Sequence, residues 1–398
     1  MNKILAVNKL PDALNRYIAL FDLDAFFVSV ERLQDKRLIG KPVIVCGMSG
    51  RSVVSTCSYE ARKFGVHSAM PVLMAKHLCP NGIYVNGHME LYRKYSKMVT
   101  DIIAGKAPVY EKASIDEHYL DLSGMERFFD CYKWTQELRQ FIIKNTGLPI
   151  SCALSVNKTV AKIAADEVKP NGTIFLPRHE VQAFLDPLSI KKIPMLGEKT
   201  FQVLSSMGIS TIQMLRETSP GTMKRLFGKN GEVLWEKANG RDDTPVIQHR
   251  ERKSLSNERT FEKDTSDREL LERVLITMVE HLAYDLRKEQ SLTSCVAIKI
   301  RYSDFTTRTA EKHIPFTSFD HLLIKAIKEL FETLYPGNLP VRLIGVRFSS
   351  MVKGSWQMDL FDDTPQMARL NSAMDMIRNR FGTDAVKRAV DINTPKKD

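Results

Sequence analysis

The stretch YIALFDLDAFFVSVERL, residues 17–33, begins with strand-like alternation and then changes to helical spacing. In the strand part Asp22 shares one face with Ile18 and Leu20, so we expect it at the end of a buried strand. A buried carboxylate is costly unless it is paired, hydrogen-bonded or bound to a metal. The partners of Asp22 are therefore the first question that the sequence raises.

A second acidic pair lies in ASIDEHYLDLSG, residues 113–124, where Asp116 and Glu117 precede a run that predicts another buried strand. Carboxylate oxygens are the ligands that Mg²⁺ prefers, and two such ions can stabilise both oxygens of a phosphoryl transfer. The alternative is an exposed hairpin turn in which both acids face water. Consecutive residues of a regular strand point to opposite faces, so a shared metal site requires irregular backbone here.

Strands and helices are mixed up to about residue 176 without a regular βαβ alternation, which favours an α+β domain with an antiparallel or mixed sheet. The patterns predict strands at 42–47, 52–58 and 149–156, and helices at 59–66, 89–105, 131–147 and 158–172.

Residues 177–240 read as short helices only, and a charged linker follows at 241–253. The region 254–350 predicts the order β-α-β-β-α-β, which is ferredoxin-like. Its first helix is expected to begin with a capping box of Ser266 and Glu269.

One strand of this ferredoxin-like region carries apolar residues at 296, 298, 300 and 302, and Lys299 and Arg301 point the other way. With Arg308 as a third candidate, these cations either face a partner or form a solvated surface. A further amphipathic helix is expected at 366–381.

Composition limits the class of protein. The 398 residues are 43% hydrophobic and 26% charged, enough for several cores, and the net charge of +11 suits a polyanionic partner. The six cysteines are scattered without a C-x-x-C pair, which predicts a reducing, cytoplasmic compartment. The N-terminus contains no signal-type apolar run, and no stretch reaches the length of a membrane span.

Four segments carry a resemblance. FDLDAFFVSVE, TCSYEARKFGV, SIDEHYLDLSG and KTVAKIAADEVKPNG look like the successive signatures of the Y-family DNA polymerases, closest to the bacterial DNA polymerase IV branch. The resemblance covers almost the whole chain. It implies a right-hand polymerase with palm (1–25 and 88–176), fingers (26–87), helical thumb (177–240), linker (241–253), ferredoxin-like little finger (254–350) and tail (351–398).

By motif position, Asp22, Asp116 and Glu117 would be the catalytic triad that binds two Mg²⁺ ions, with the main-chain carbonyl of Leu23 as an additional ligand. Asp24 matches a family acid, but we expect it to be a structural, hydrogen-bonded carboxylate rather than a ligand. Catalysis would consist mainly of positioning and electrostatic stabilisation.

The resemblance also implies contacts for the incoming nucleotide. Phe27 falls on the steric-gate position, where a ring would collide with a ribose 2′-hydroxyl; the alternative is a core phenylalanine, which we expect of Phe26. The residues that match the triphosphate contacts of the family are Thr56, Tyr59, Arg62 and Lys169.

Two departures from the family pattern stand out. IPMLGEKT resembles the thumb's helix-hairpin-helix, which grips DNA phosphate, but Met195 replaces its first glycine, so only Gly197 would remain to relax the turn. His118 follows Glu117 where the family has a small residue, and we expect it to be a spectator rather than to tune the acid.

The tail segment QMDLFDD resembles the motif by which bacterial polymerases dock on the sliding clamp, with Gln357 as the polar anchor and Leu360 and Phe361 entering an apolar pocket.

The resulting hypothesis is a translesion DNA polymerase, a monomer that acts on primer-template DNA and deoxynucleoside triphosphates. Two alternatives belong to other classes: a non-catalytic clamp- and DNA-binding scaffold of the same family, and a palm-type nucleotidyl cyclase. The retained carboxylates disfavour the first, and the thumb-like and little-finger-like regions disfavour the second.

Overall fold

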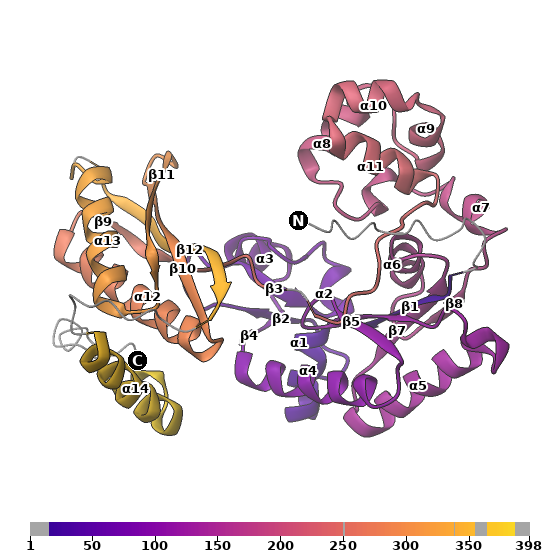
Figure 1. The fold of residues 1–398 in the computed structure, drawn as a ribbon. Coiled ribbons are helices and arrows are strands. Elements are labelled where there is room, and N and C mark those ends of the chain that lie inside the picture. Colours follow the sequence, from indigo (N-terminus) through magenta and orange to yellow (C-terminus); the bar gives the residue numbers. More distant parts are fainter. Residues whose placement is uncertain (1–15, 250, 338, 355–363, 387–398) are drawn as a thin grey trace, which may run out of the picture. The chain divides into compact units, whose positions relative to one another are not determined.

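The computed structural model describes residues 16–249, 251–337, 339–354 and 364–386, and the chain divides into two compact units, Met1–Arg250 and Glu251–Asp398. The first unit contains a five-stranded and a three-stranded sheet, and the second contains a four-stranded sheet (Figure 1). The mixture of helices and sheets confirms the α+β class. Among the described helices, none combines the length and the apolar character that a bilayer crossing needs.

The five-stranded sheet has the order β5-β6-β1-β7-β8, and only β7 and β8 run parallel. Its central strand β1 is buried throughout. Phe21 packs in the core formed by α1 (Phe26–Gln34), α4 and α5, and Leu20 packs in the core formed by α6. Helices on both faces explain why β1 is apolar at nearly every position. Asp22 lies on the α6 side of the sheet with Leu20, as predicted. The elements are β1 (Ile18–Leu23), α4 (Met89–Ala104), β5 (Val109–Lys112), β6 (Glu117–Asp121), η2 (Met125–Arg127), α5 (Cys131–Thr146), β7 (Ile150–Ser155), α6 (Lys158–Glu167) and β8 (Thr173–Phe175).

The three-stranded sheet has the order β3-β2-β4 and a core of its own, which includes Ile44 and Val54. The predicted strands at 42–47 and 52–58 are confirmed. The helix predicted at 59–66 is shorter, since it ends at Arg62 and is followed by Gly65 with φ +84°. The elements are α1 (Phe26–Gln34), η1 (Lys36–Leu38), β2 (Val43–Cys46), β3 (Val54–Cys57), α2 (Tyr59–Arg62), α3 (Val72–Leu78) and β4 (Ile83–Asn86).

Residues 177–240 form a cluster of helices, as the sequence predicts (Figure 1). Their buried residues, among them Leu204 and Met223, belong to the same hydrophobic core as α6. Side-chain caps begin two of the helices: Thr211 accepts from Met214 N, and Ser219 from Thr222 N. The elements are α7 (Val181–Leu185), η3 (Ile190–Lys192), α8 (Glu198–Ser206), α9 (Ile212–Glu217), α10 (Pro220–Phe227) and α11 (Lys229–Ala238).

The turn before α8 differs from the expectation for Gly197. Gly197 has an ordinary φ of −77°, whereas Met195 has a φ of +72° and a side chain that is 90% exposed. The expectation that Gly197 relaxes this turn is therefore wrong. The residue with left-handed backbone in this turn is Met195. Its Cβ makes this conformation less favourable than it would be for glycine.

Met195→Gly is expected to raise the free energy of unfolding by up to about 1.5 kcal/mol. Relief of the left-handed strain is worth about 1–2 kcal/mol, and the greater entropy of glycine in the unfolded chain removes about 0.4–1 kcal/mol of that gain. Urea unfolding measures the change. Met195→Ala is the matched control, because it keeps a Cβ at the positive φ and should leave stability nearly unchanged; equal stabilisation by both variants would contradict the strain at Met195.

The first part of the predicted linker is attached to the first unit. Asp242 accepts a hydrogen bond from Thr159 Oγ1 at 2.7 Å, and the backbone N–H of Ile247 donates to Glu111 Oε2 at 2.8 Å. Two residues of the predicted linker thus make specific contacts with α6 and β5.

The second unit has the predicted order β-α-β-β-α-β and a fully antiparallel sheet in the order β11-β10-β12-β9. Helices α12 and α13 cover one face, where Val296, Ile298, Ile300 and Tyr302 of β10 are buried, as predicted. Lys299 and Arg301 lie on the other face, which we call the open face. The elements are β9 (Ser254–Thr265), α12 (Arg268–Lys288), β10 (Ser291–Tyr302), β11 (Thr307–Thr317), α13 (Asp320–Leu334), β12 (Val341–Lys353), α14 (Thr364–Phe381) and η4 (Thr383–Ala385).

Two details of the second unit differ from the prediction. Asp267, not Ser266, caps α12, and its side chain accepts from Leu270 N. Arg308 pairs in register with Ile300, so it shares the helix-covered side of the sheet and lies over the ring of Tyr302 rather than beside Lys299.

The predicted C-terminal helix is present as α14, and it packs on α12 through polar contacts. Arg287 of α12 donates to both carboxylate oxygens of Asp375, at 2.7 and 2.9 Å, and to Asp320 at 2.6 Å. Tyr284 donates to Asn379 Oδ1 at 2.6 Å. These contacts make α14 part of the second unit.

Candidate active site

The two acidic segments meet across paired strands. β1 and β6 run antiparallel with Asp22 directly opposite Glu117, and opposite residues of such a pair share a face. Asp116 lies in a bend just before β6, and its carbonyl accepts from Leu23 N at 3.1 Å. The irregular backbone that the metal-site hypothesis requires is therefore present, and the exposed-turn alternative does not fit the partly buried acids.

Lys162 of α6 joins the two carboxylates. Its Nζ donates to Asp22 Oδ2 at 2.8 Å and to Glu117 Oε1 at 2.7 Å, so the two oxygens are close enough to share one cation. Helix α6 crosses the face of the sheet on which Asp22 and Glu117 lie, which explains how Lys162 reaches them. The sequence analysis did not select this lysine.

A second ammonium group approaches Asp22. Lys169 Nζ lies 2.7 Å from Asp22 Oδ2 and 2.8 Å from Asp166 Oδ1, and Asp166 also accepts from Lys162 at 3.1 Å. Asp166 was not predicted either. The available signal was helical spacing, since Lys162 and Asp166 are four residues apart and point the same way from α6.

Neighbouring charges and burial shift the pKa values of this group. Burial, with Asp22 and Asp116 nearby, raises the pKa of Glu117 although Lys162 opposes the shift. Burial works against the charge of Lys162, but the carboxylates of Asp22, Asp166 and Glu117 raise its pKa overall. A site that concentrates carboxylates in a poorly solvated place gains from cations, whether ammonium groups or metal ions.

The carboxylate of Asp24 has a different environment. It is 2% exposed and accepts from Ser151 Oγ at 2.9 Å, from Asn171 N at 2.7 Å and from Tyr59 Oη at 3.2 Å. Burial raises its pKa, against the hydrogen bonds from Asn171 and Ser151. The geometry agrees with the structural role expected for Asp24.

Phe26 and Phe27, at the start of α1, lie in different environments, as expected. Phe26 is buried in the core, whereas Phe27 is partly exposed and stacks on the ring of Tyr92 with centroids 4.2 Å apart and an interplanar angle of 9°. Tyr92 in turn donates a hydrogen bond to Glu31, which also contacts His88. Tyr92 therefore restrains the Phe27 ring, a role that the sequence did not reveal.

The predicted triphosphate contacts lie on β3, α2 and the segment after α6. The Arg62 guanidinium lies over the Tyr59 ring, 4.6 Å from its centroid, and burial raises the pKa of Tyr59. Thr56 lies on β3 opposite Val45 and is partly exposed. Of these residues, Lys169 contacts Asp22 of the carboxylate group, and Tyr59 contacts the structural carboxylate Asp24.

His118 points away from the carboxylates. It lies opposite Phe21 on the other face of the sheet, and its Nε2 is 2.9 Å from Thr100 Oγ1. Burial lowers its pKa to about 3, so the imidazole is neutral near pH 7. These observations agree with the expectation that His118 is a spectator that does not tune the neighbouring acid.

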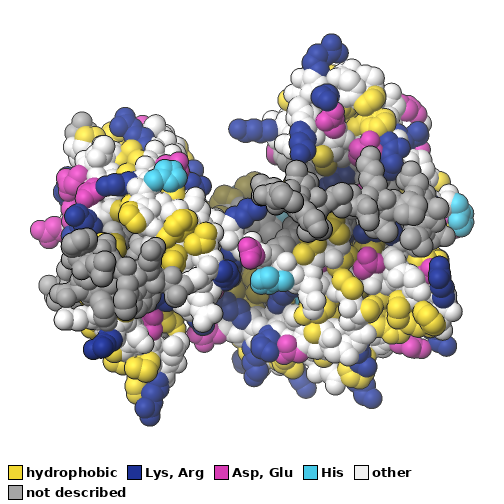
Figure 2. Space-filling view, viewed as in Figure 1, with side chains coloured by type: hydrophobic (Ala, Val, Ile, Leu, Met, Phe, Trp, Pro, Cys, Tyr) yellow, Lys and Arg dark blue, Asp and Glu magenta, His cyan; other side chains and the backbone are white. Residues whose placement is uncertain are grey.

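Two of the candidate DNA contacts, Lys299 and Arg301, lie in the second unit, and Gly197 precedes α8 in the first unit. On the open face Lys299 donates to Glu258 Oε1 at 2.7 Å, and Arg301 donates to Thr307 Oγ1 at 2.9 Å. On the side in view in Figure 2, Lys and Arg side chains are scattered with acidic ones among them. Gln357, Leu360 and Phe361 lie outside the described residues.

Comparisons with known proteins agree over most of the chain. Residues 21–166 match the impB/mucB/samB family, and residues 252–360 match the C-terminal domain of that family. The chain is 38% identical over 376 residues to a DNA polymerase IV of Dehalococcoides mccartyi, which covers 94% of this chain and 96% of that protein. A DNA polymerase IV of Listeria innocua is 36% identical and covers 85% of this chain and 96% of its own length.

Comparison with solved structures also finds DNA polymerases. A Y-family DNA polymerase chimera of Dbh and Dpo4 matches with a TM-score of 0.75 and 26% identity, covering 85% of this chain and 100% of the chimera. An insertion ternary complex of Dbh DNA polymerase matches with a TM-score of 0.61 and 25% identity, with the same coverage.

Proposed function

Because this chain belongs to the Y-family DNA polymerases, with relatives of the DNA polymerase IV type, we propose that Asp22, Asp116 and Glu117 are the carboxylates with which it performs nucleotide addition. The chain is a template-directed DNA polymerase of the translesion class, which adds deoxynucleotides to a primer. Its retained carboxylates distinguish it from a non-catalytic scaffold.

One observation carries the assignment of the site. The carboxylates of Asp22 and Glu117, from segments about 95 residues apart, both contact one ammonium group, at 2.8 and 2.7 Å. Asp116 adjoins Glu117 and raises its pKa through its charge, which supports a single acidic group of three members. A purely structural role would need fewer carboxylates in so poorly solvated a place.

Members of this family are metal-dependent, and the donors here fit a hard divalent ion because they are oxygens only. We propose two Mg²⁺ ions, held by Asp22, Asp116, Glu117 and the main-chain carbonyl of Leu23. When bound, the ions would activate the primer hydroxyl and stabilise charge on the leaving pyrophosphate. Lys162 fixes the spacing of Asp22 and Glu117 from the protein side.

Positive and hydrogen-bonding groups beside the acids suit the triphosphate. We propose that Lys169 and Arg62 bind its phosphates, with Tyr59 and Thr56 as hydroxyl donors. Arg62 is held over the Tyr59 ring, and Tyr59 is anchored on Asp24. This chain of contacts orients the nucleotide site relative to the carboxylates.

Phe27→Ala is expected to raise ribonucleotide incorporation relative to deoxyribonucleotide by about 10–100-fold, since a steric clash of this kind costs about 1–3 kcal/mol. The ring is restrained by its stack on Tyr92, so it cannot easily yield to a 2′-hydroxyl. Competitive primer extension with both sugars measures the ratio. Phe27→Tyr keeps the bulk and is the control; unchanged sugar selection in Phe27→Ala would argue against a gate.

For the DNA we propose palm, fingers, thumb and little finger with the boundaries given above, and contacts from Gly197, Lys299 and Arg301. The net charge of +11 supports a polyanionic partner. We propose that the chain acts as a monomer. Six buried thiols support the expected cytoplasmic compartment.

Leu360→Ala with Phe361→Ala is expected to abolish stimulation by a bacterial sliding clamp and to leave clamp-free synthesis intact. The reason is the QMDLFDD motif, whose two large apolar residues in an acidic segment suit an apolar pocket. Primer extension with and without clamp measures both activities. Met358→Ala, inside the motif but not at an anchor position, is the control, and equal losses in both assays would indicate a structural role.

Primer extension by the purified chain with Mg²⁺ and a defined template tests the function itself. We expect templated addition of deoxynucleotides and no product from nucleotide alone. The absence of addition would favour the scaffold, and cyclic product without primer would favour a nucleotidyl cyclase.

A further inference from the structure

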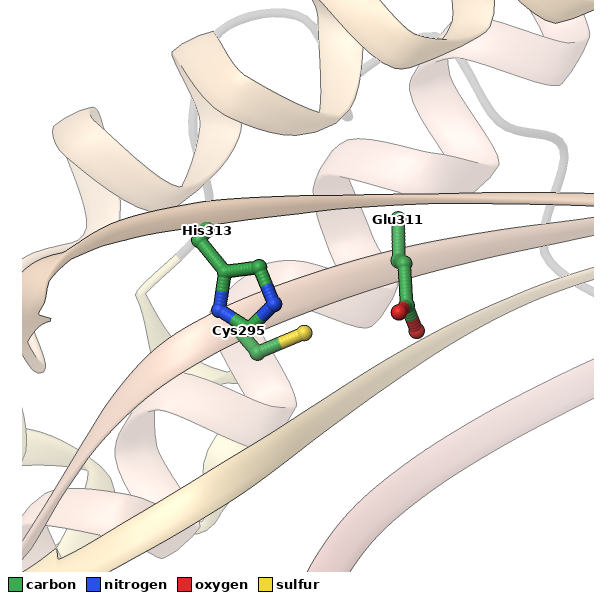
Figure 3. A group of neighbouring side chains, drawn as sticks. All are labelled: Cys295, Glu311 and His313. Atoms are coloured by element: carbon green, nitrogen blue, oxygen red, sulfur yellow. The ribbon is translucent and has the colours of Figure 1, made fainter.

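A second group of metal-ligating side chains lies on the open face of the four-stranded sheet. Cys295 belongs to β10, and Glu311 and His313 belong to β11. One ligand atom from each residue lies within 4.8 Å of the others. Figure 3 shows the Cys295 sulfur directed between the imidazole of His313 and the carboxylate of Glu311.

The strand pairing explains why these three side chains converge. Cys295 is directly opposite His313 in the register of β10 and β11, and Glu311 lies two residues before His313 on the same face. A register shift between Thr293 and Cys295 interrupts the regular pairing beside the group. Cys295 is also paired with Ser349 of β12, so its backbone is held from both sides.

A thiolate, an imidazole and a carboxylate form a ligand set for Zn²⁺ rather than for Mg²⁺, which prefers oxygen alone. We propose that Cys295, Glu311 and His313 bind one zinc-type divalent cation, with the fourth position open to water or another ligand. This site is chemically distinct from the acidic group of the first unit.

The surroundings allow the side chains to close on an ion. Cys295 is 3% exposed and fixed, whereas Glu311 and His313 are exposed and can change rotamer. A hollow of about 240 Å³ lies next to the group, lined by Glu311 and by the small residues Ala297 and Gly345. Glu311 also contacts Arg347 at 3.4 Å, but both side chains are more than half exposed, so this pair gives way easily.

Binding changes the charge of the open face. A thiol and a carboxylate together carry one negative charge, and a Zn²⁺ ion bound to the thiolate and the carboxylate gives a neutral group. Formation of the site therefore releases the thiol proton and removes one negative charge from the sheet.

Titration of the purified full-length chain with Co²⁺ in excess Mg²⁺ tests the proposal. Mg²⁺ occupies oxygen-only sites, and thiolate-bound Co²⁺ gives a near-ultraviolet charge-transfer band that oxygen ligands do not give. We expect this band to saturate at one equivalent and to be removed by Zn²⁺. Cys295→Ser should abolish it, and His313→Gln and Glu311→Gln should each weaken binding by at least about tenfold, as even loss of an outer-shell partner often does.

Glu258→Gln is the matched control, because Glu258 lies on the same open face, carries the same charge and pairs with Lys299 rather than with the group. It should bind Co²⁺ as the parent does. His313 is exposed, so His313→Gln tests the site even if Cys295→Ser folds poorly. The proposal is overturned by the absence of the band, by a band that survives Cys295→Ser, or by equal weakening in Glu258→Gln and Glu311→Gln.

Discussion

Asp22→Asn is expected to lower the rate of nucleotide addition by at least about a thousandfold, because a carboxylate that holds a catalytic metal ion supplies several kcal/mol of transition-state stabilisation. Asp22 is the most central of the three acids: it lies opposite Glu117, is 3% exposed, and contacts both Lys162 and Lys169. The amide removes the charge and keeps the shape, so the fold should tolerate the change. Single-turnover primer extension with Mg²⁺ measures the chemical step.

The matched control is Asp121→Asn, at the other end of β6. Asp121 accepts a hydrogen bond from Ser123 N and has no contact with the acidic group, so its loss should leave the rate within about threefold of the parent, as expected for a substitution worth well under 1 kcal/mol. Comparable losses in the two variants would show that the effect of Asp22→Asn comes from stability and not from catalysis.

Arg287→Ala is expected to lower the unfolding free energy of the second unit by about 3–5 kcal/mol, because removal of one partner from a buried ion pair leaves a poorly solvated charge. Arg287 donates to Asp320, whose side chain is 1% exposed, and to both oxygens of Asp375. These carboxylates raise the pKa of Arg287, against the effect of burial. Hydrogen exchange of the α12 amides measures the opening free energy.

The control is Arg347→Ala in the same unit. Arg347 contacts Glu311 at 3.4 Å with both side chains largely exposed, so its removal should cost less than about 1 kcal/mol. If both arginine variants destabilise α12 equally, the network between α12 and α14 does not hold the unit together.

Periodicity predicted the faces of the buried strands correctly. The positions of Asp22 on β1 and of Lys299 on β10 follow from period-two alternation alone, because a one-residue error would move every apolar neighbour to the wrong face. The requirement for irregular backbone at Asp116 came from the same rule, and the bend before β6 satisfies it. The sequence also indicated the role of Asp24, because a carboxylate at the end of a buried strand needs hydrogen bonds.

Features that depend on tertiary geometry could not be predicted. The face of Arg308 depends on the register of the β10–β11 hairpin, which is set by its turn, where Phe305 has a φ of +66°. Ser266 and Asp267 are adjacent residues of the kind that cap helices, so the sequence does not decide between them, and the structure has Asp267 as the cap of α12. In the sequence, Lys162 is one of several polar residues of an amphipathic helix. Its contact with Asp22 depends on the position of α6 over the carboxylates, which the sequence does not show.

The packing of α14 has a mechanical consequence. β12 ends at Lys353 and α14 begins at Thr364, and both elements are fixed in the second unit, β12 by the sheet and α14 by its contacts with Arg287 and Tyr284. A force applied to the residues between β12 and α14 therefore acts on both elements. Any partner that pulls there acts on the whole unit rather than on a free end.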